Sequence, residues 1–414
     1  MKEESSITVS SSVPPKSLAN SNLFELIKVG PVILKNRLVH APTTRFRNSE
    51  DFVATDSMLE YYTDRAENNG GLLIVEATFP APEFGLFENA PMIHTPAQVK
   101  AFRKITDSVH SKGTFIAAQL WNLGRTADPL ALKKRNLPFV APSAIYFDEA
   151  SEKAAKDAGN ELREITIPEI KAMIKEYAAS AKRAVDEAGF DIVEIHAAHQ
   201  YLLDQFLQQI SNKRTDEYGG SIENRARFIL EVVDAIIEAV GAERVAIRVS
   251  PYAEYQGGAG YKAEINPIVT WGYLLSELER RAKEGKRLAY ISLVEPRFPS
   301  GHDNSEAANV DFTWPELIWK GVIIRAGGYL DSRHIDRLEP AVNKNDRTLI
   351  AVGRYFTSNP DLVERVKKGL EITAYNRDTF YVMGSNIGYL GYSKYGEGST
   401  RDTLRDGIKL QPLA

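Results

Sequence analysis

The chain has 414 residues, 51 basic and 55 acidic side chains, a formal net charge of −4 and no cysteine. Without cysteine it can have no disulfide, no thiolate nucleophile and no cysteine-ligated zinc or iron–sulfur centre. The slightly acidic balance argues against a nucleic acid or an anionic membrane surface as the main partner.

Residues 1–21 are polar and lack the apolar core of a signal peptide. We expect them to form a disordered extension of a cytoplasmic protein. No apolar run in the chain reaches the roughly 18 residues that a membrane span needs. We expect residues 22–414 to form one domain, with two short strands at 28–30 and 32–34 that could close the floor of a barrel.

Eight short runs rich in apolar and β-branched residues follow along the chain. Each is nearly continuous in apolar character at its start, which is typical of parallel strands buried on both faces. The runs are 38–42, 72–78, 115–121, 191–197, 245–251, 289–295, 322–328 and 348–354.

Helical patterns with clear start and stop signals lie between these runs. Strand and helix alternate eight times, which predicts a (β/α)8 barrel of one domain. The alternative is a doubly wound sheet, but no GxGxxG turn follows an early strand. The long polar stretch 127–165 would overhang the top of the barrel as a lid or excursion. The clearest predicted helices begin after Thr95, Thr166, Ser221 and Asn359 and end at Gly113, Gly189, Gly241 and Gly369.

The polar residues that end the strands of such a barrel form its active site. Gly327 and Gly328 end the seventh strand, and Gly353 and Arg354 end the eighth. Exposed backbone N–H groups and a guanidinium suit a phosphate group. The alternative is that these glycines only allow the loops to turn.

Two histidines and a tyrosine follow the fourth strand. His196 and His199 could donate hydrogen bonds to an oxygen that gains negative charge, bind a metal, or have only a structural role. No third metal ligand accompanies them in a recognisable motif. Tyr201 could donate a proton, or it could be an ordinary partly buried tyrosine.

Three further polar residues lie in or after strands. Arg248 interrupts an apolar strand and needs an anionic partner, either a ligand or an ion pair with Glu76 or Glu194. The Gln119 amide offers a donor and an acceptor, which suits the edge of a pyrimidine ring. The Thr44 hydroxyl could contact a ligand or cap a turn.

A long motif connects these residues. The stretch Glu194–Phe228 contains H-x-x-[NH]-x-Y followed by R-x-D-x-Y-G-G-S-x-x-N-R. Together with APTTRFR (41–47), QLWNLGR (119–125) and RDTFYVM (377–383), it resembles the Old Yellow Enzyme family of FMN-dependent ene-reductases. The resemblance extends from about residue 22 to the mid-390s, in the same order.

The resemblance implies an NADPH dehydrogenase, or ene-reductase, with tightly bound, non-covalent FMN, NAD(P)H as reductant and no metal. Its substrates would be activated alkenes such as enones, enals and nitroalkenes. His196 and His199 would bind the electron-withdrawing oxygen, and Tyr201 would protonate the carbon that does not receive hydride from FMN N5. The implied FMN-binding residues are Pro42, Thr44, Ala77, Gln119, Arg248, Gly327, Gly328, Gly353 and Arg354.

The resemblance also implies that Trp121 and Tyr381 line the substrate pocket, with Phe298 as a candidate substrate-loop aromatic. The enzyme would be a monomer or a homodimer. A pathway reductase of the same fold that acts on an alkaloid- or oxylipin-type precursor is one alternative. A non-catalytic flavin-binding protein and a metal-dependent barrel hydrolase are two others.

Overall fold

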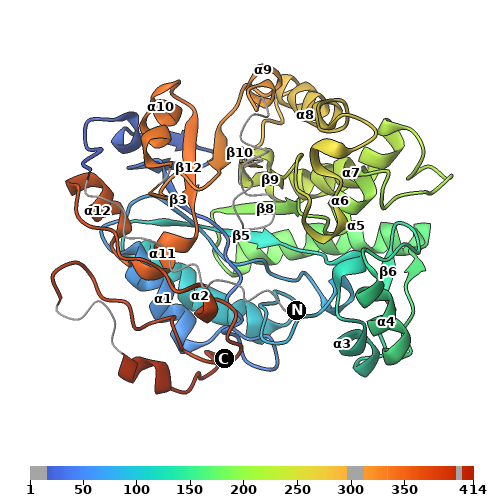
Figure 1. Ribbon diagram of the computed structural model, residues 1–414, viewed down its shortest axis with the longest axis horizontal. Helices are drawn as coiled ribbons and strands as arrows, with labels where there is room; N and C mark the ends of the chain where they lie inside the picture. The colour runs from blue at the N-terminus through green and yellow to red at the C-terminus, as the bar shows by residue number, and fades with distance from the viewer. Residues whose placement is uncertain (1–15, 296–311, 333, 398–402) are drawn as a thin grey trace, which may run out of the picture.

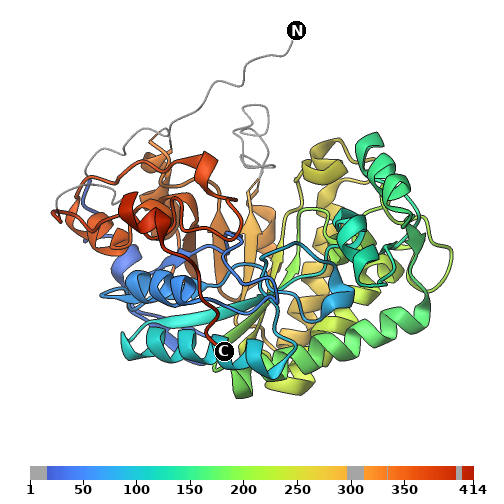
Figure 2. The ribbon, with the colours of Figure 1, turned by 90° about the horizontal axis from the view of Figure 1, so that it is seen from below.

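The computed structural model describes residues 16–295, 312–332, 334–397 and 403–414. Eight parallel strands form a closed barrel with helices around it (Figures 1 and 2). Strand β12 pairs with β3, which closes the ring and rules out the doubly wound alternative. The strands are β3 (Leu38–His40), β4 (Leu72–Ile74), β5 (Phe115–Leu120), β8 (Ile192–Ala197), β9 (Val245–Val249), β10 (Tyr290–Val294), β11 (Ile323–Ala326) and β12 (Thr348–Val352).

All eight predicted strands are present, and several end earlier than predicted. Strand β11 ends at Ala326, two residues before Gly328. Gly328 has a φ of +69°, a left-handed conformation that a strand cannot contain. The residues after these strands therefore leave the sheet and become available to line a site at its C-terminal edge.

A short antiparallel hairpin of β1 (Ile27–Val29) and β2 (Val32–Leu34) lies at the floor of the barrel, as predicted. The alternate side chains of both strands are buried and pack against interior barrel residues such as Leu72 and Ile192. A Cβ on Gly30 would lie 2.0 Å from the backbone oxygen of Glu243, so the hairpin turn packs tightly against the segment before β9.

The outer helices bury apolar faces against the barrel. The capping boxes at Thr95 and Thr166 are confirmed, and Ser221 caps the third predicted helix. The last predicted helix begins at Leu362, because the Asn359 side-chain oxygen accepts from the Arg365 guanidinium at 2.6 Å and the Thr373 N–H at 2.8 Å instead of capping a helix at 360. The larger helices are α1 (Asp56–Ala66), α2 (Pro96–Ser111), α5 (Ile167–Lys182), α7 (Ile222–Val240) and α8 (Pro267–Lys283). The shorter ones are α6 (Leu202–Leu207), α9 (Trp314–Ile318), α10 (Leu338–Asn343), α11 (Arg354–Ser358) and α12 (Leu362–Lys368).

The excursion at 127–165 forms a small structure of its own at one side of the barrel (Figure 1). It contains α3 (Pro129–Lys134), α4 (Glu149–Ala158) and a parallel pair of two-residue strands, β6 (Val140–Ala141) and β7 (Arg163–Glu164).

The expected disordered extension falls largely on residues 1–15, outside the described residues. Residues 16–21 are described, and there Leu18 is buried and donates its N–H to the Val366 carbonyl at 3.2 Å. The helices of the described residues include none that is long and apolar enough to cross a bilayer.

Candidate active site

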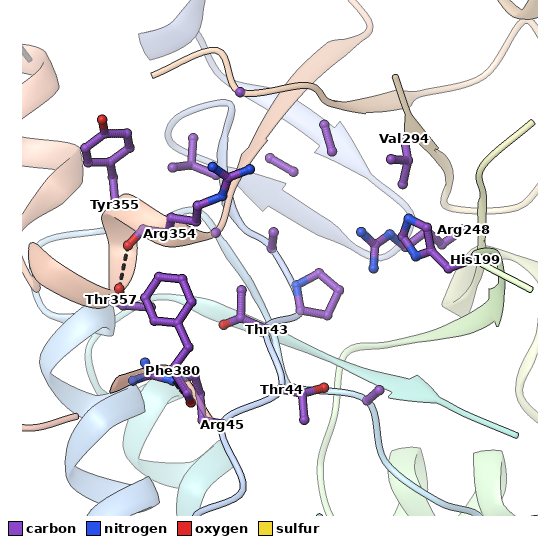
Figure 3. A pocket seen from close by; sticks show the side chains of 18 of the residues that line it. Thr43, Thr44, Arg45, His199, Arg248, Val294, Arg354, Tyr355, Thr357 and Phe380 are labelled. Carbon is purple, nitrogen blue, oxygen red and sulfur yellow. Dashed lines mark hydrogen bonds between the residues drawn. The ribbon is translucent and has the colours of Figure 1, made fainter. Parts of the chain in front are cut away.

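A cavity of about 560 Å³ opens at the C-terminal ends of the barrel strands, within the usual size range of small-molecule sites. Part of its lining is drawn in Figure 3. The described lining contains no residue of the excursion at 127–165. Every residue assigned to FMN, substrate or catalysis in the sequence analysis lines this cavity except Phe298, which lies outside the described residues.

Three rings form one wall of the cavity. His196 is near the end of β8, and the Tyr201 ring lies 4.8 Å from its imidazole, centroid to centroid, at an interplanar angle of 89°. The Trp121 indole, just after β5, lies 4.9 Å from the Tyr201 ring at 90°. Edge-to-face contacts of this kind are favourable and fix ring orientation. These contacts hold the Tyr201 ring, and the Gln256 side chain interacts with its hydroxyl.

His199 lies in the turn between β8 and α6, with its ring centroid 5.9 Å from that of His196. Its backbone N–H donates to the Ser250 hydroxyl at 2.7 Å, and its carbonyl accepts from the Gln256 amide at 2.8 Å. Both partners follow β9. Two neighbouring strand ends therefore place the two imidazoles in one cavity.

The electrostatics of the wall favour neutral side chains. Burial, with a smaller effect of the Arg248 cation, lowers the pKa of His199 to about 3. The same two causes, with His199 itself, lower the pKa of His196 well below its ordinary value. Burial raises the pKa of Tyr201, so its hydroxyl stays protonated. Near neutral pH each imidazole therefore keeps one N–H to donate, and Tyr201 keeps its proton.

A second group of polar atoms fits the polar edge of a flavin ring. The Arg248 guanidinium donates no hydrogen bond to Glu76 or Glu194 among the described residues, and Glu194 is the carboxylate that acts on it electrostatically. The Gln119 amide nitrogen donates to Glu194 at 2.6 Å. The Gln119 amide oxygen is buried and has no hydrogen-bond partner among the described residues. The Arg248 cation could donate to acceptors on a ring edge, and the Gln119 amide oxygen could accept from an N–H donor on the same edge.

The opposite side of the cavity fits a phosphate group. Arg354 and Arg248 reach into the cavity from opposite sides (Figure 3). The Arg354 guanidinium also donates to the Tyr375 hydroxyl at 3.0 Å. A Cβ on Gly353 would lie 2.9 Å from the Thr43 methyl group, so a side chain here would crowd the strand ends. Two cations on opposite sides of one cavity fit FMN, which is anionic at one end and has a polar ring edge at the other.

The structure adds lining residues that the sequence analysis did not select. Tyr255 follows β9, and Tyr375, Arg377 and Phe380 come from the C-terminal segment. Arg377 and Phe380 lie in the RDTFYVM stretch that supports the resemblance, four positions and one position before Tyr381, so this motif also points to them.

Two buried arginines hold this C-terminal segment against the cavity. Arg45 donates to the Phe380 and Gly388 carbonyls at 3.1 and 2.8 Å, and Arg47 donates to the Thr379 carbonyl at 3.0 Å. Both arginines follow β3, more than 330 residues earlier in the chain. The wall that carries Phe380 is thus tied to the first strand of the barrel.

No cluster of three or more His, Asp or Glu side chains that could hold a metal ion occurs in the described ranges. His196 and His199 thus lack a third protein ligand there.

Comparisons with known proteins agree with this geometry. The family model described as the NADH:flavin oxidoreductase / NADH oxidase family matches residues 22–373. A probable NADPH dehydrogenase of Candida albicans is 48% identical over 385 residues, which cover 91% of this chain and 92% of that protein. Enoate reductase 1 of Kluyveromyces lactis is 42% identical over 395 residues, covering 92% and 96%. The crystal structure of Old Yellow Enzyme from Pichia sp. AKU4542 is 58% identical, with a TM-score of 0.92, and the match covers 96% of this chain and 100% of that one.

Proposed function

Because the chain belongs to the NADH:flavin oxidoreductase / NADH oxidase family, that of Old Yellow Enzyme, we propose that it reduces the activated double bond of α,β-unsaturated carbonyl or nitro compounds. The family resemblance inferred from the motifs is confirmed. The chain is an FMN-dependent oxidoreductase with NAD(P)H as its reductant.

The observation that carries the proposal is the meeting of two neutral imidazoles and one protonated phenol in a single cavity. A binding protein for flavin alone has no need for a proton donor there. FMN, when bound, supplies the hydride, since no side chain can carry one.

The side chains would then perform the polar part of the reaction. His196 and His199 donate N–H hydrogen bonds to the carbonyl or nitro oxygen and draw electron density from the β carbon, which becomes the hydride acceptor. Tyr201 gives its hydroxyl proton to the α carbon, so that one hydride and one proton complete the reduction. Trp121 and Tyr381 flank the alkene in this arrangement.

Two sets of residues would hold the cofactor. Pro42, Thr44, Ala77, Gln119 and Arg248 would contact the ring, with Arg248 and Gln119 at its polar edge. The phosphate would lie against the backbone of three glycines and the guanidinium of one arginine, namely Gly327, Gly328, Gly353 and Arg354.

The proposal is tested with the purified holoenzyme under anaerobic conditions. We expect FMN absorbance to bleach with NADPH or NADH and to return on addition of 2-cyclohexenone, with cyclohexanone as product. Bleaching without reoxidation by cyclohexenone, other enones or nitroalkenes would refute the substrate class. A chain that takes up no FMN would refute the cofactor assignment. That the enzyme is a monomer or a homodimer stays a prediction.

A further inference from the structure

The turn that carries the proposed catalytic residues has an unusual backbone. His199 and Gln200 have φ values of +57° and +58°, so two consecutive residues that are not glycine are left-handed. This conformation is costly for residues with a Cβ and persists only when surrounding contacts hold it. Tyr201 follows directly as the N-cap residue of α6. The direction of two proposed catalytic side chains thus depends on how this turn is held.

Gln200 is anchored through its N–H, its carbonyl and its side-chain oxygen, although it does not line the cavity and its amide nitrogen has no partner among the described residues. It is completely buried, and its backbone N–H donates to a carboxylate oxygen of Asp204 at 2.8 Å. Its backbone oxygen accepts from the Gln205 amide at 2.6 Å. Its side-chain oxygen accepts from the Arg125 guanidinium at 2.7 Å. A residue that only spans a turn would not need a buried side-chain anchor.

Arg125 connects this anchor to the neighbouring loops. It is buried, follows β5 and has no ion pair within the described ranges. The nitrogen that binds Gln200 also donates to the Gln256 carbonyl at 3.2 Å, while its other terminal nitrogen donates to the Ile145 carbonyl of the excursion at 3.4 Å. The Gln256 side chain in turn donates to the His199 carbonyl. One guanidinium therefore ties together the loops after β5, β8 and β9.

Asp204 completes the arrangement from the other side. Its oxygen that accepts from Gln200 also accepts from the Gln208 amide at 2.9 Å, and its other carboxylate oxygen is buried without a partner among the described residues. Arg125 is the charged group that acts on it electrostatically. Gln200 is thus held by a cation at its side chain and by an acid at its N–H.

We propose that Arg125 and Asp204 act as positioning residues that lock Gln200 in its left-handed conformation and so orient His199 and Tyr201 toward the substrate. This inference rests on the proposed function, because it concerns the residues that act on the alkene. Arg125 and Asp204 themselves make no contact with substrate or cofactor in this proposal. It also gives the excursion at 127–165 a supporting contact with the turn through the Ile145 carbonyl.

The test compares two ways of removing electrons from the pre-reduced holoenzyme. Reoxidation by 2-cyclohexenone needs His199 and Tyr201 in place, whereas reoxidation by ferricyanide needs no proton transfer to carbon. We expect Gln200→Ala and Gln200→Gly each to slow the cyclohexenone reaction by about tenfold or more, since small misplacements of catalytic groups have such effects. The ferricyanide rate should stay at the wild-type value in both variants.

The glycine variant separates the anchor from the backbone preference. Glycine adopts positive φ without strain, so a role of the backbone conformation alone predicts a wild-type cyclohexenone rate for Gln200→Gly. That result would refute the proposed positioning role of Arg125 and Asp204. An equal loss of the cyclohexenone and ferricyanide rates would also refute it. If ferricyanide reoxidises the wild-type enzyme and no activated alkene reoxidises it, the proposed function is refuted instead.

Variants of the two anchoring residues give an independent check. Arg125→Lys keeps the charge but loses the planar fork, and we expect it to slow the cyclohexenone reaction selectively. The matched control is Arg225→Lys, because Arg225 is equally buried and donates to the backbone carbonyls of Leu207 and Gly220. Asp204→Asn keeps an acceptor oxygen, so its cyclohexenone rate should be close to that of the wild type. Asp204→Ala has no acceptor oxygen, and its cyclohexenone rate should be lower. Equal selective losses in Arg125→Lys and Arg225→Lys would contradict the proposal.

Discussion

The Tyr201 phenol and the His196 imidazole meet edge to face, with ring centroids 4.8 Å apart and an interplanar angle of 89°. The Trp121 indole packs against the same phenol at 4.9 Å and 90°. Ring packing holds Tyr201 in place, so its hydroxyl can be removed while its position is kept. This separation of position from chemistry makes the proton-donor role directly testable.

Replacing Tyr201 by Phe should slow reoxidation of the reduced enzyme by 2-cyclohexenone by about 10²- to 10⁴-fold, the usual contribution of a general acid. Reduction by NADPH should be unchanged, because that step requires no proton for an α carbon. Stopped-flow measurement of FMN absorbance resolves the two half-reactions. An undiminished cyclohexenone rate would show that the proton comes from another group.

The two histidines should bind substrate with little pH dependence. The pKa of His199 is lowered to about 3 and that of His196 is lowered by burial, so both imidazoles stay neutral from pH 5 to pH 8. We expect the KM for cyclohexenone to be constant over this range, and a transition near pH 6.5 would contradict the assignment. Replacing His199 by Leu removes one donor and should raise the KM for cyclohexenone by about tenfold. Replacing His199 by Asn keeps an N–H and should raise this KM less.

The same shifts have a consequence for stability with a definite sign. The unfolded chain binds protons at these histidines near pH 6.5, whereas the folded chain does not. The contribution of these two histidines to the free energy of unfolding should therefore fall as the pH is lowered below about 6.5.

The two cavity arginines should act on different parts of the cofactor. Removing a charge-assisted hydrogen bond to phosphate costs about 1.5–3 kcal/mol, so Arg354→Met should raise the Kd for FMN by about tenfold to a hundredfold. The same variant should bind riboflavin, which lacks the phosphate, as well as the wild type does. Arg248→Met should weaken FMN and riboflavin alike. Fluorescence titration of the apoprotein measures all of these constants, and equal effects of Arg354→Met on both flavins would exclude a phosphate contact.

Asp204 should make the protein less stable as pH rises. Burial raises its pKa from 3.8 to about 7, so between these values the folded chain holds a proton that the unfolded chain releases. The contribution of Asp204 to the free energy of unfolding should fall with rising pH across this window, by up to about 4 kcal/mol at 1.4 kcal/mol for each pKa unit.

The neutral isostere Asp204→Asn should lack this part of the pH dependence. Urea unfolding at pH 5 and pH 8 is the appropriate measurement. We expect the variant to gain stability over the wild type at the higher pH. An identical pH dependence in both proteins would show that Asp204 is not the titrating group.

Much of the fold followed from local pattern. The eight apolar runs are the barrel strands, because parallel strands covered by helices must be apolar on both faces. Their ends were less accurately predicted, since the residues after β11 still look like strand until Gly328 turns left-handed. The site residues were reachable because the long motif after the fourth strand and the strand-end position pointed to the same side chains.

By itself, the sequence determined the barrel, the family and about half of the residues that line the cavity. Those features depend on apolar periodicity and on motifs that are short-range along the chain. Tertiary structure alone decided how these side chains are held. Arg45 reaches a carbonyl of Phe380, Arg125 reaches the Gln200 side chain, and a positive φ lets His199 and Gln200 make the turn. Such contacts join segments from 75 to 335 residues apart, and backbone carbonyls, which accept from Arg45, carry no sequence signal because every residue has one.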